Sequence, residues 1–203
     1  MRAAIAVFAF MFWIGESSVH AQEYKEGPYI GISAGYLAIE ANDGDVSGTD
    51  VDVEFDDGFG VGVQLGYKHW VWRLEAEFEY GRSGYQSIDA LGSSTDVDGD
   101  FDIYRWTGGV YYDLDNLSRF TPYFGGGLGV AYVDVDDVSD GVVTVDGESD
   151  TYFTTHGEVG LTIGLSDRFA VVPAYRYLWM NTGGGGLDDD TAHLLKVGAR
   201  YNF

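Results

Sequence analysis

Apolar residues occupy every second position in eight stretches of the chain. In the clearest stretch, Trp72, Leu74, Ala76, Phe78 and Tyr80 alternate with Arg73, Glu75, Glu77 and Glu79. A helix, with 3.6 residues per turn, would scatter the glutamates around its circumference, so this pattern predicts a β-strand with one apolar face and one polar face. The other seven predicted strands are residues 29–39, 59–68, 101–112, 123–133, 152–165, 169–180 and 193–203.

The connections between these predicted strands alternate in length. The short ones lie at residues 68–70, 113–119 and 166–168. The long ones lie at residues 40–57, 81–102, 134–150 and 181–192. Short turns at one end and long loops at the other are typical of an up-and-down barrel in the bacterial outer membrane.

The start of the chain predicts a targeting segment. Arg2 precedes an uncharged, apolar run over residues 3–14, and Val19-His20-Ala21 places small residues at positions −3 and −1 of a cleavage site. This is the layout of a secretory signal, and the apolar run is shorter than the roughly 20 residues that a membrane-spanning helix needs. We therefore expect a signal peptide over residues 1–21, cleavage after Ala21, and one barrel domain over residues 22–203.

Charge is concentrated in the long connections. The chain has 33 acidic and 11 basic residues and a formal net charge of −22, and most of the acids lie in the four predicted loops, where Arg82 is the single base. We expect acidic surface loops around a nearly neutral barrel, and no nucleic-acid partner, because such loops repel anions. The chain has no cysteine, which rules out disulfide bonds.

The apolar face is expected to point outward. An eight-stranded barrel has an interior just wide enough to be filled by side chains, which favours glycines and a few long charged side chains over many large aromatic ones. About ten residues of about 3.3 Å each, tilted by about 40°, span about 25 Å, the height of an outer-membrane apolar band. The sequence thus predicts an all-β fold, a closed eight-stranded antiparallel up-and-down transmembrane β-barrel.

Ten charged side chains are expected to meet inside this barrel. They are Lys68, Arg73, Glu75, Glu77, Glu79, Arg105, Glu158, Arg176, Lys196 and Arg200. Because an unpaired buried charge is costly, their near-balance of sign favours a paired network that plugs the lumen. The alternative is an ion path gated by rearranged pairs, which would make the protein a narrow, porin-like channel.

The sequence contains none of the common soluble-enzyme motifs, and we expect neither an enzyme nor a bound cofactor. His156 and Glu158 share the polar face of one predicted strand, but no good nucleophile stands beside them. A lipid-modifying barrel enzyme is therefore the third hypothesis, behind a structural role and a channel.

One acidic loop offers a weak metal hypothesis. Asp96, Asp98, Asp100 and Asp102 resemble part of a calcium loop, but the glycine is misplaced and the closing glutamate of an EF-hand is missing. One interpretation is a solvated acidic loop. The other is weak Ca²⁺ or Mg²⁺ binding at the cell surface.

Four segments carry a resemblance to a known family. They are residues 29–36 (YIGISAGY), 122–129 (PYFGGGLG), 175–177 (YRY) and 196–203 (KVGARYNF). From about Tyr29 to Phe203 the chain resembles the small outer-membrane β-barrel proteins, akin to the OmpA membrane domain and the opacity-type surface antigens. That family has no common activity and includes structural proteins, adhesins, host-interaction antigens and narrow channels. The resemblance implies outer-membrane lipids and lipopolysaccharide as surroundings and surface ligands as partners.

The ending of the chain is the most specific part of this resemblance. Lys196, Gly198, Tyr201 and Phe203 match the polar, glycine, aromatic and final aromatic positions of the C-terminal assembly signal of the class. The resemblance therefore implies recognition by the outer-membrane assembly machinery.

Deletion of Phe203 is expected to separate folding from assembly. The loss of one interfacial aromatic side chain should cost the finished barrel about 1.5–3 kcal/mol at most, so refolding into detergent should be only mildly impaired. In cells the protein should be degraded or held in the periplasm, as measured by fractionation and immunoblotting. Normal outer-membrane levels would contradict the assembly role and leave the barrel prediction intact.

Overall fold

A computed structural model describes most of the chain beyond its first 25 residues. The described residues are 26–39, 42–46, 49–55, 57–90, 93–96, 100–116, 118–135, 138–139, 144–145, 149–181 and 190–203. The predicted signal peptide, residues 1–21, lies outside the described residues. No helix in the described part of the chain is long and apolar enough to cross a membrane.

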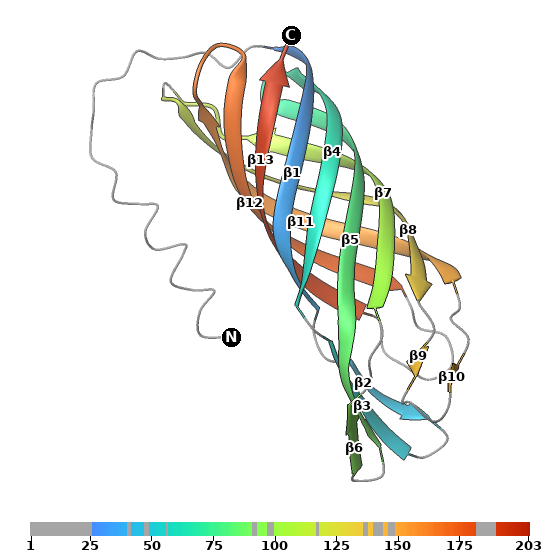
Figure 1. The fold of residues 1–203 in the computed structure, drawn as a ribbon. Coiled ribbons are helices and arrows are strands. Elements are labelled where there is room, and N and C mark those ends of the chain that lie inside the picture. The colour runs from blue at the N-terminus through green and yellow to red at the C-terminus, as the bar shows by residue number, and fades with distance from the viewer. Residues whose placement is uncertain are drawn as a thin grey trace.

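Eight long antiparallel strands form a closed ring (Figure 1). In ring order they are β1 (Gly27–Ile39), β4 (Gly58–His69), β5 (Trp72–Ala90), β7 (Asp100–Asp113), β8 (Phe120–Val135), β11 (Ser149–Gly164), β12 (Phe169–Asn181) and β13 (Asp190–Asn202). Each strand pairs with the next one in this order, and β13 returns to pair with β1. The predicted eight-stranded, up-and-down barrel is confirmed.

Closure depends on the seam between the first and last strands. β1 runs antiparallel to β13 from Tyr29 opposite Asn202 to Ile39 opposite Ala192. With this seam made, no strand of the ring keeps a free edge along the barrel wall, and the backbone N–H and C=O groups of the ring are paired within the protein.

Short additional strands lie at the end of the barrel that carries the long connections (Figure 1). They are β2 (Asn42–Val46), β3 (Thr49–Phe55), β6 (Ser93–Asp96), β9 (Val138–Ser139) and β10 (Thr144–Val145). β3 and β6 both pair with the part of β5 that continues beyond the barrel. The prediction of plain loops over residues 40–57 and 81–102 is therefore wrong in part. In residues 50–54 acids alternate with valines, which is the period of two that indicates a strand. The strand was missed because the high density of acids in this segment is typical of a loop.

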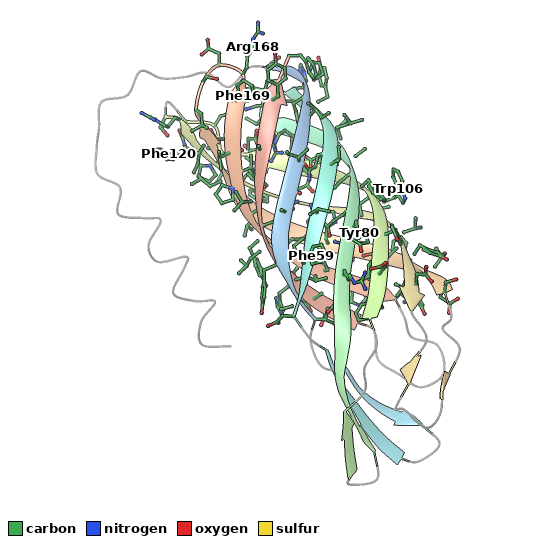
Figure 2. All side chains as sticks on the ribbon, in the orientation of Figure 1. Phe59, Tyr80, Trp106, Phe120, Arg168 and Phe169 are labelled. Atoms are coloured by element: carbon green, nitrogen blue, oxygen red, sulfur yellow. The ribbon has the colours of Figure 1, made fainter. Side chains whose placement is uncertain are left out.

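The two faces of the strands differ sharply in their surroundings. Ile32, Leu74 and Trp106 on the outer face are each about 60% exposed, whereas Arg73 and Arg176 on the inner face are 1% and 0% exposed. Figure 2 shows the Trp106 side chain standing away from the barrel wall. The assignment of the apolar face to the outside is confirmed, and it follows from the period of two along each strand.

Aromatic side chains form rows at both ends of the outer surface. Near the short turns, Trp72 lies 5.0 Å from Tyr112 between ring centroids, and Tyr112 lies 5.6 Å from Phe124. Near the long connections the row runs through Phe59, Tyr80, Tyr104 and Tyr132, with centroid separations of 6.1, 5.3 and 6.2 Å. Two such rows are typical of the interfacial girdles of membrane barrels.

Three tyrosines lie inside the barrel, against the expectation that large aromatic residues stay outside. Tyr29, Tyr111 and Tyr123 are 2–3% exposed. The Tyr29 ring lies on Gly66 of β4, and a Cβ added at Gly66 would be 2.6 Å from Tyr29 Cε1. The Tyr123 ring lies on Gly160 of β11, and a Cβ added at Gly160 would be 2.6 Å from Tyr123 Cζ. The missing side chain of a neighbouring glycine thus supplies the room that each ring needs.

Replacing Gly160 by Val is expected to displace the Tyr123 ring. Overpacking of this kind should lower the free energy of unfolding by about 1–3 kcal/mol, measured by urea unfolding in lipid vesicles. The matched control is Gly157→Val on the same strand, because Gly157 faces outward and an added Cβ there meets nothing within 4 Å. If the two variants are equally stable, the tyrosine–glycine packing contributes nothing to stability.

Candidate functional site in the barrel lumen

All ten charged residues predicted to face the lumen are buried. Each is at most 9% exposed, and each projects inward from a barrel strand. The structure brings them together in two groups, one at mid-barrel and one near the short turns. Side chains whose role the sequence did not predict join both groups.

The central group is organised around Arg176 of β12, which is fully buried. Its guanidinium nitrogens lie 2.5 Å from a carboxylate oxygen of Glu77, 3.2 Å from one of Glu79 and 2.6 Å from one of Glu158. Glu77 and Glu79 come from β5, and Glu158 comes from β11, so one arginine connects two walls of the barrel. Ion pairs with planar guanidinium geometry are among the stronger polar contacts in proteins.

Two further bases complete the charge of the central group. Lys196 Nζ lies 3.1 Å from Glu77 and 3.0 Å from Glu158, and Arg105 pairs with Glu79. Gln64 of β4 donates hydrogen bonds to Glu77 Oε1 at 2.6 Å and to Ser33 Oγ at 2.7 Å. Three bases therefore face three acids, and each carboxylate of the group has a basic partner.

The second group lies near the short turns and contains an acid that the sequence analysis assigned to a turn. Asp113 is 2% exposed, and it pairs with Arg73 at 2.7 Å and with Lys68 at 3.2 Å. Lys68 also lies 2.9 Å from Asp115, which is partly exposed at the rim. The sequence contained a sign that Asp113 faces the lumen. Positions 107, 109 and 111 of the same strand face inward, and Asp113 is the next position in this alternating series.

Glu75 joins the remaining members of the second group. It lies 3.5 Å from Arg73 and 3.7 Å from Arg200, and it accepts a hydrogen bond of 2.5 Å from the hydroxyl of Tyr29. The Arg200 guanidinium lies 4.4 Å from the ring centroid of Tyr29. Cation–π contacts of this kind let a buried guanidinium keep a favourable partner where carboxylates are few.

Tyr123 connects the two groups. Its hydroxyl donates a hydrogen bond of 2.7 Å to Glu158 in the central group, and its ring lies 4.4 Å from the Arg73 guanidinium in the second group. The buried network therefore extends from mid-barrel to the short turns. Sequence alternation could not reveal this link, since it depends on which strands lie near β8. Glu158 stands on the paired neighbour β11, and Arg73 stands on β5, two strands away.

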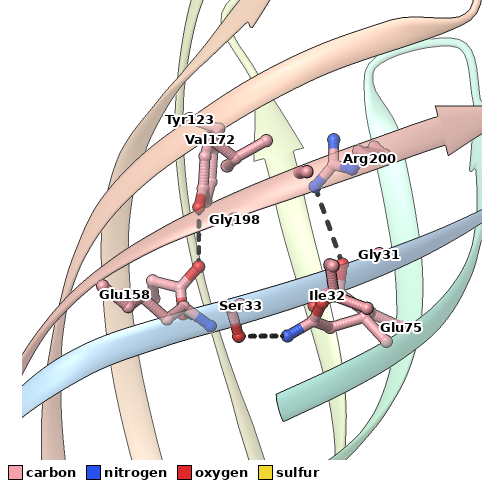
Figure 3. Close-up of a pocket in the computed structure, with 12 residues that line it drawn as sticks. Gly31, Ile32, Ser33, Glu75, Tyr123, Glu158, Val172, Gly198 and Arg200 are labelled. Carbon is pink, nitrogen blue, oxygen red and sulfur yellow. Dashed lines mark hydrogen bonds and ion pairs between the residues drawn. The ribbon is translucent and has the colours of Figure 1, made fainter. Parts of the chain in front are cut away.

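A small cavity separates parts of the two groups (Figure 3). Its volume is about 20 Å³, and Ser33, Gln64, Glu75, Lys196 and Arg200 contribute to its lining. Figure 3 shows the Tyr123–Glu158 hydrogen bond on one side of it and the Arg200–Glu75 ion pair on the other. Such a volume holds about one water molecule, so this cavity is too small for an organic ligand.

His156 does not form part of a nucleophilic site in the described part of the chain. Its Nε2 atom lies 3.0 Å from the hydroxyl of Tyr111, and its ring stacks on the ring of that tyrosine. Thr154, on the same face of β11, donates its hydroxyl to the backbone oxygen of Trp179 at 3.1 Å. The arrangement pairs the histidine with a phenol and gives it no activated serine or threonine.

The predicted cation site falls mostly where side chains are not described. Asp98 lies outside the described residues, Asp96 ends β6 and Asp100 begins β7. Asp102 accepts a hydrogen bond of 2.8 Å from Tyr80 and lies 3.9 Å from Arg82. No group of three or more His, Cys, Asp or Glu residues suited to a metal occurs in the part of the chain that was described. Weak Ca²⁺ or Mg²⁺ binding stays a prediction.

The four residues of the predicted assembly signal divide between the two faces of β13. Lys196 and Gly198 face the lumen, where Gly198 lies opposite Ser33 and lines the small cavity. Tyr201 and Phe203 lie together at the strand end, with ring centroids 5.2 Å apart, and Phe203 is 62% exposed. Their recognition by assembly machinery stays a prediction.

Comparison with solved structures places this barrel among small outer-membrane proteins. Neisserial surface protein A matches with a TM-score of 0.59 and 19% identity, over 87% of this chain and 97% of that one. OprG from Pseudomonas aeruginosa matches with a TM-score of 0.57 and 19% identity, over 90% and 99%. A major outer membrane protein from Thermus thermophilus gives 0.54 and 12%, over 87% and 99%. At these identities the likeness concerns the fold alone.

Sequence comparisons settle the family. Curated proteins give no significant match to the chain. A family model described as the outer membrane protein beta-barrel domain, however, matches residues 4–203. Because this match covers nearly the whole sequence, and because the resemblance in its strand segments and ending points the same way, the chain belongs to the outer-membrane β-barrel family.

Proposed function

We propose that this protein is an integral outer-membrane barrel with a structural and surface-contact role, and that its lumen is plugged by the buried ion-pair network. The observation that carries the proposal is the central group, in which the fully buried Arg176 contacts three glutamates from two other strands. Such a group fills the lumen at mid-barrel and ties opposite walls together.

The plug is favoured over a conducting path by the cost of taking it apart. A buried charge that loses its partner costs about 3–5 kcal/mol, because neither water nor another ion replaces the lost contact. Arg176, Glu77 and Glu158 would all have to separate for an ion to pass the central group. The network therefore stabilises a closed barrel.

The surface role rests on the acidic long connections. In barrels of this class the long loops face the outside and the short turns face the periplasm. Residues 40–57 carry eight acids and no base. We propose that these connections hold the surface in a hydrated state and present it to ligands that carry positive charge. Outer-membrane lipids and lipopolysaccharide surround the barrel, which the assembly machinery inserts after cleavage of the signal peptide.

A narrow ion channel is the second candidate. It is favoured by the small polar cavity between the two charged groups, which holds about one water molecule. In this alternative, the cavity marks a path along which the ion pairs exchange partners. A lipid-modifying enzyme ranks third, because His156 contacts a tyrosine and no serine or threonine hydroxyl among the described residues.

Removal of the central arginine is expected to destabilise the barrel strongly. Arg176→Met should leave Glu77, Glu79 and Glu158 short of positive charge and lower the free energy of unfolding by about 3–5 kcal/mol. Glu77→Gln keeps the shape of the side chain and should cost less, about 1–3 kcal/mol. Urea unfolding in lipid vesicles, followed by tryptophan fluorescence, measures both changes.

The matched control for these substitutions is Glu26→Gln. Glu26 is exposed and pairs at 3.6 Å with His69, which is also exposed, so its replacement should leave stability unchanged. If Arg176→Met is as stable as this control, the central group does not hold the barrel together.

Planar-bilayer recordings test the closed lumen directly. We expect the wild-type protein to insert without resolved current steps at physiological salt, since its lumen is occupied by paired side chains. Stable, repeated steps from pure protein would favour the narrow channel instead. Heat-modifiable mobility on gels, measured on the same preparation, shows that the protein under test is a folded barrel.

A further inference from the structure

The inward-facing side chains change in character along the barrel axis. Toward the long connections the buried inward-facing side chains are mostly apolar, and Ser83 and Thr154 are the polar residues buried at this end among those described. Six of the apolar residues are each at most 6% exposed. They are Leu37, Phe101, Ile103, Ala131, Leu178 and Leu194, which we term the apolar layer. Sequence alternation predicted a polar lumen throughout and did not find this layer.

The apolar layer extends around much of the lumen. Leu37, Leu178 and Leu194 form one cluster, and Phe101, Ile103 and Ala131 form another. Ile39 packs against both clusters and joins them. The six members come from five of the eight barrel strands: β1, β7, β8, β12 and β13.

A glycine of β5 brings the layer close to the backbone. A Cβ added at Gly81 of β5 would lie 3.5 Å from Leu37 Cδ2 and 3.9 Å from Ile103 Cβ. Side chains from β1 and β7 therefore reach the wall at the same point. Ile103 belongs to the strand paired with β5, whereas Leu37 comes from β1, two strands away, and reaches Gly81 because β5 contributes no side chain there.

The apolar layer lies directly next to the central ion-pair group. Leu178 stands two residues from Arg176, Leu194 two from Lys196, and Ile103 two from Arg105, so each is the next inward-facing position of its strand. These three steps all run toward the long connections.

One wall glycine shows the contact between layer and group. A Cβ added at Gly60 would lie 3.6 Å from Leu194 Cδ1 and 3.7 Å from Glu79 Oε1. Leucine and carboxylate thus meet at one point of the wall, with the apolar layer on the side of the long connections.

We infer that the apolar layer is a second barrier, in series with the ion-pair plug, which excludes water and ions from the surface side of the lumen. The inference rests on the proposed closed lumen and assigns part of that closure to residues that carry no charge. Hydrophobic constrictions block ions by dewetting, because an ion that enters loses its hydration and gains no partner. The layer also keeps water and salt away from the central group, which strengthens its ion pairs.

The series arrangement makes a specific statement about the plug. Loosening the ion pairs alone leaves the apolar layer intact, so the lumen stays closed. Making the layer polar alone leaves the ion pairs in place. Conduction requires both changes.

Four variants in planar bilayers test this inference. The first, Glu77→Gln, loosens the central group. The second, the layer variant, carries Leu178→Asn and Leu194→Asn and makes the layer polar at similar side-chain volume. The third, the combined variant, carries all three substitutions, and the fourth is Leu195→Asn. The last is the matched control, because Leu195 is the neighbour of Leu194 on β13 but is 40% exposed on the outer face. Heat-modifiable mobility selects folded protein for every recording.

Of the four variants, we expect only the combined variant to conduct. Its current should be about tenfold or more above the wild-type background. A tenfold increase corresponds to about 1.4 kcal/mol removed from the free-energy barrier to ion passage. Conduction by Glu77→Gln alone at the level of the combined variant would overturn the inference, as would a silent combined variant that is folded. If the two asparagines together prevent folding, Leu178→Asn and Leu194→Asn are each combined with Glu77→Gln and judged in the same way.

Two other outcomes separate this inference from the proposed function. If the layer variant conducts as strongly as the combined variant, the ion-pair plug is not a barrier; this overturns the series arrangement and the proposed plug, and the apolar layer is then the barrier. If the wild-type protein itself conducts, the proposed closed lumen is wrong. The two asparagine substitutions then test the apolar layer by themselves. A higher current in that variant supports the layer as a barrier, and an unchanged current overturns it.

Discussion

The narrow interior of a closed eight-stranded barrel is the constraint on which the rest of the structure depends. Closure of β13 onto β1 removes free strand edges from the ring, and it leaves a lumen that side chains must fill. Glycines are therefore frequent on the inner face, because they make room for the large side chains that cross from other strands. Tyr29 over Gly66 and Tyr123 over Gly160 are two cases of this exchange of volume.

Two kinds of side-chain packing occupy that lumen. At mid-barrel and toward the short turns, buried charges are paired and further supported by tyrosine hydroxyls and rings. Toward the long connections, apolar residues fill the same cross-section. Charged groups tie distant walls through directional contacts, whereas the apolar layer excludes water because its own side chains offer no polar partner. The boundary between them lies where Leu194 and Glu79 meet beside Gly60.

This division separates the roles of the two ends of the protein. The outer surface carries aromatic rows at both membrane interfaces, and the acidic long connections extend beyond one of them. A lumen closed at mid-barrel and sealed toward the surface would let those connections contact the outside without opening a path to the periplasm. Membership of the outer-membrane β-barrel family is consistent with this reading but assigns no activity, since the fold serves several functions.

The sequence by itself determined the strands, their outer face and the ten lumen charges, because alternation with a period of two is a local property of each strand. The family was predicted separately, from the resemblance of the strand segments and the ending to known outer-membrane barrels. Only the tertiary structure decided which charges pair, that Asp113 joins Arg73, and that Tyr123 reaches Glu158 from β8. It also revealed the apolar layer, although adjacent apolar residues such as Leu194 and Leu195 were a sign that both faces are apolar there. These features depend on which strands lie beside each other or across the lumen in the ring, and no single strand contains that information.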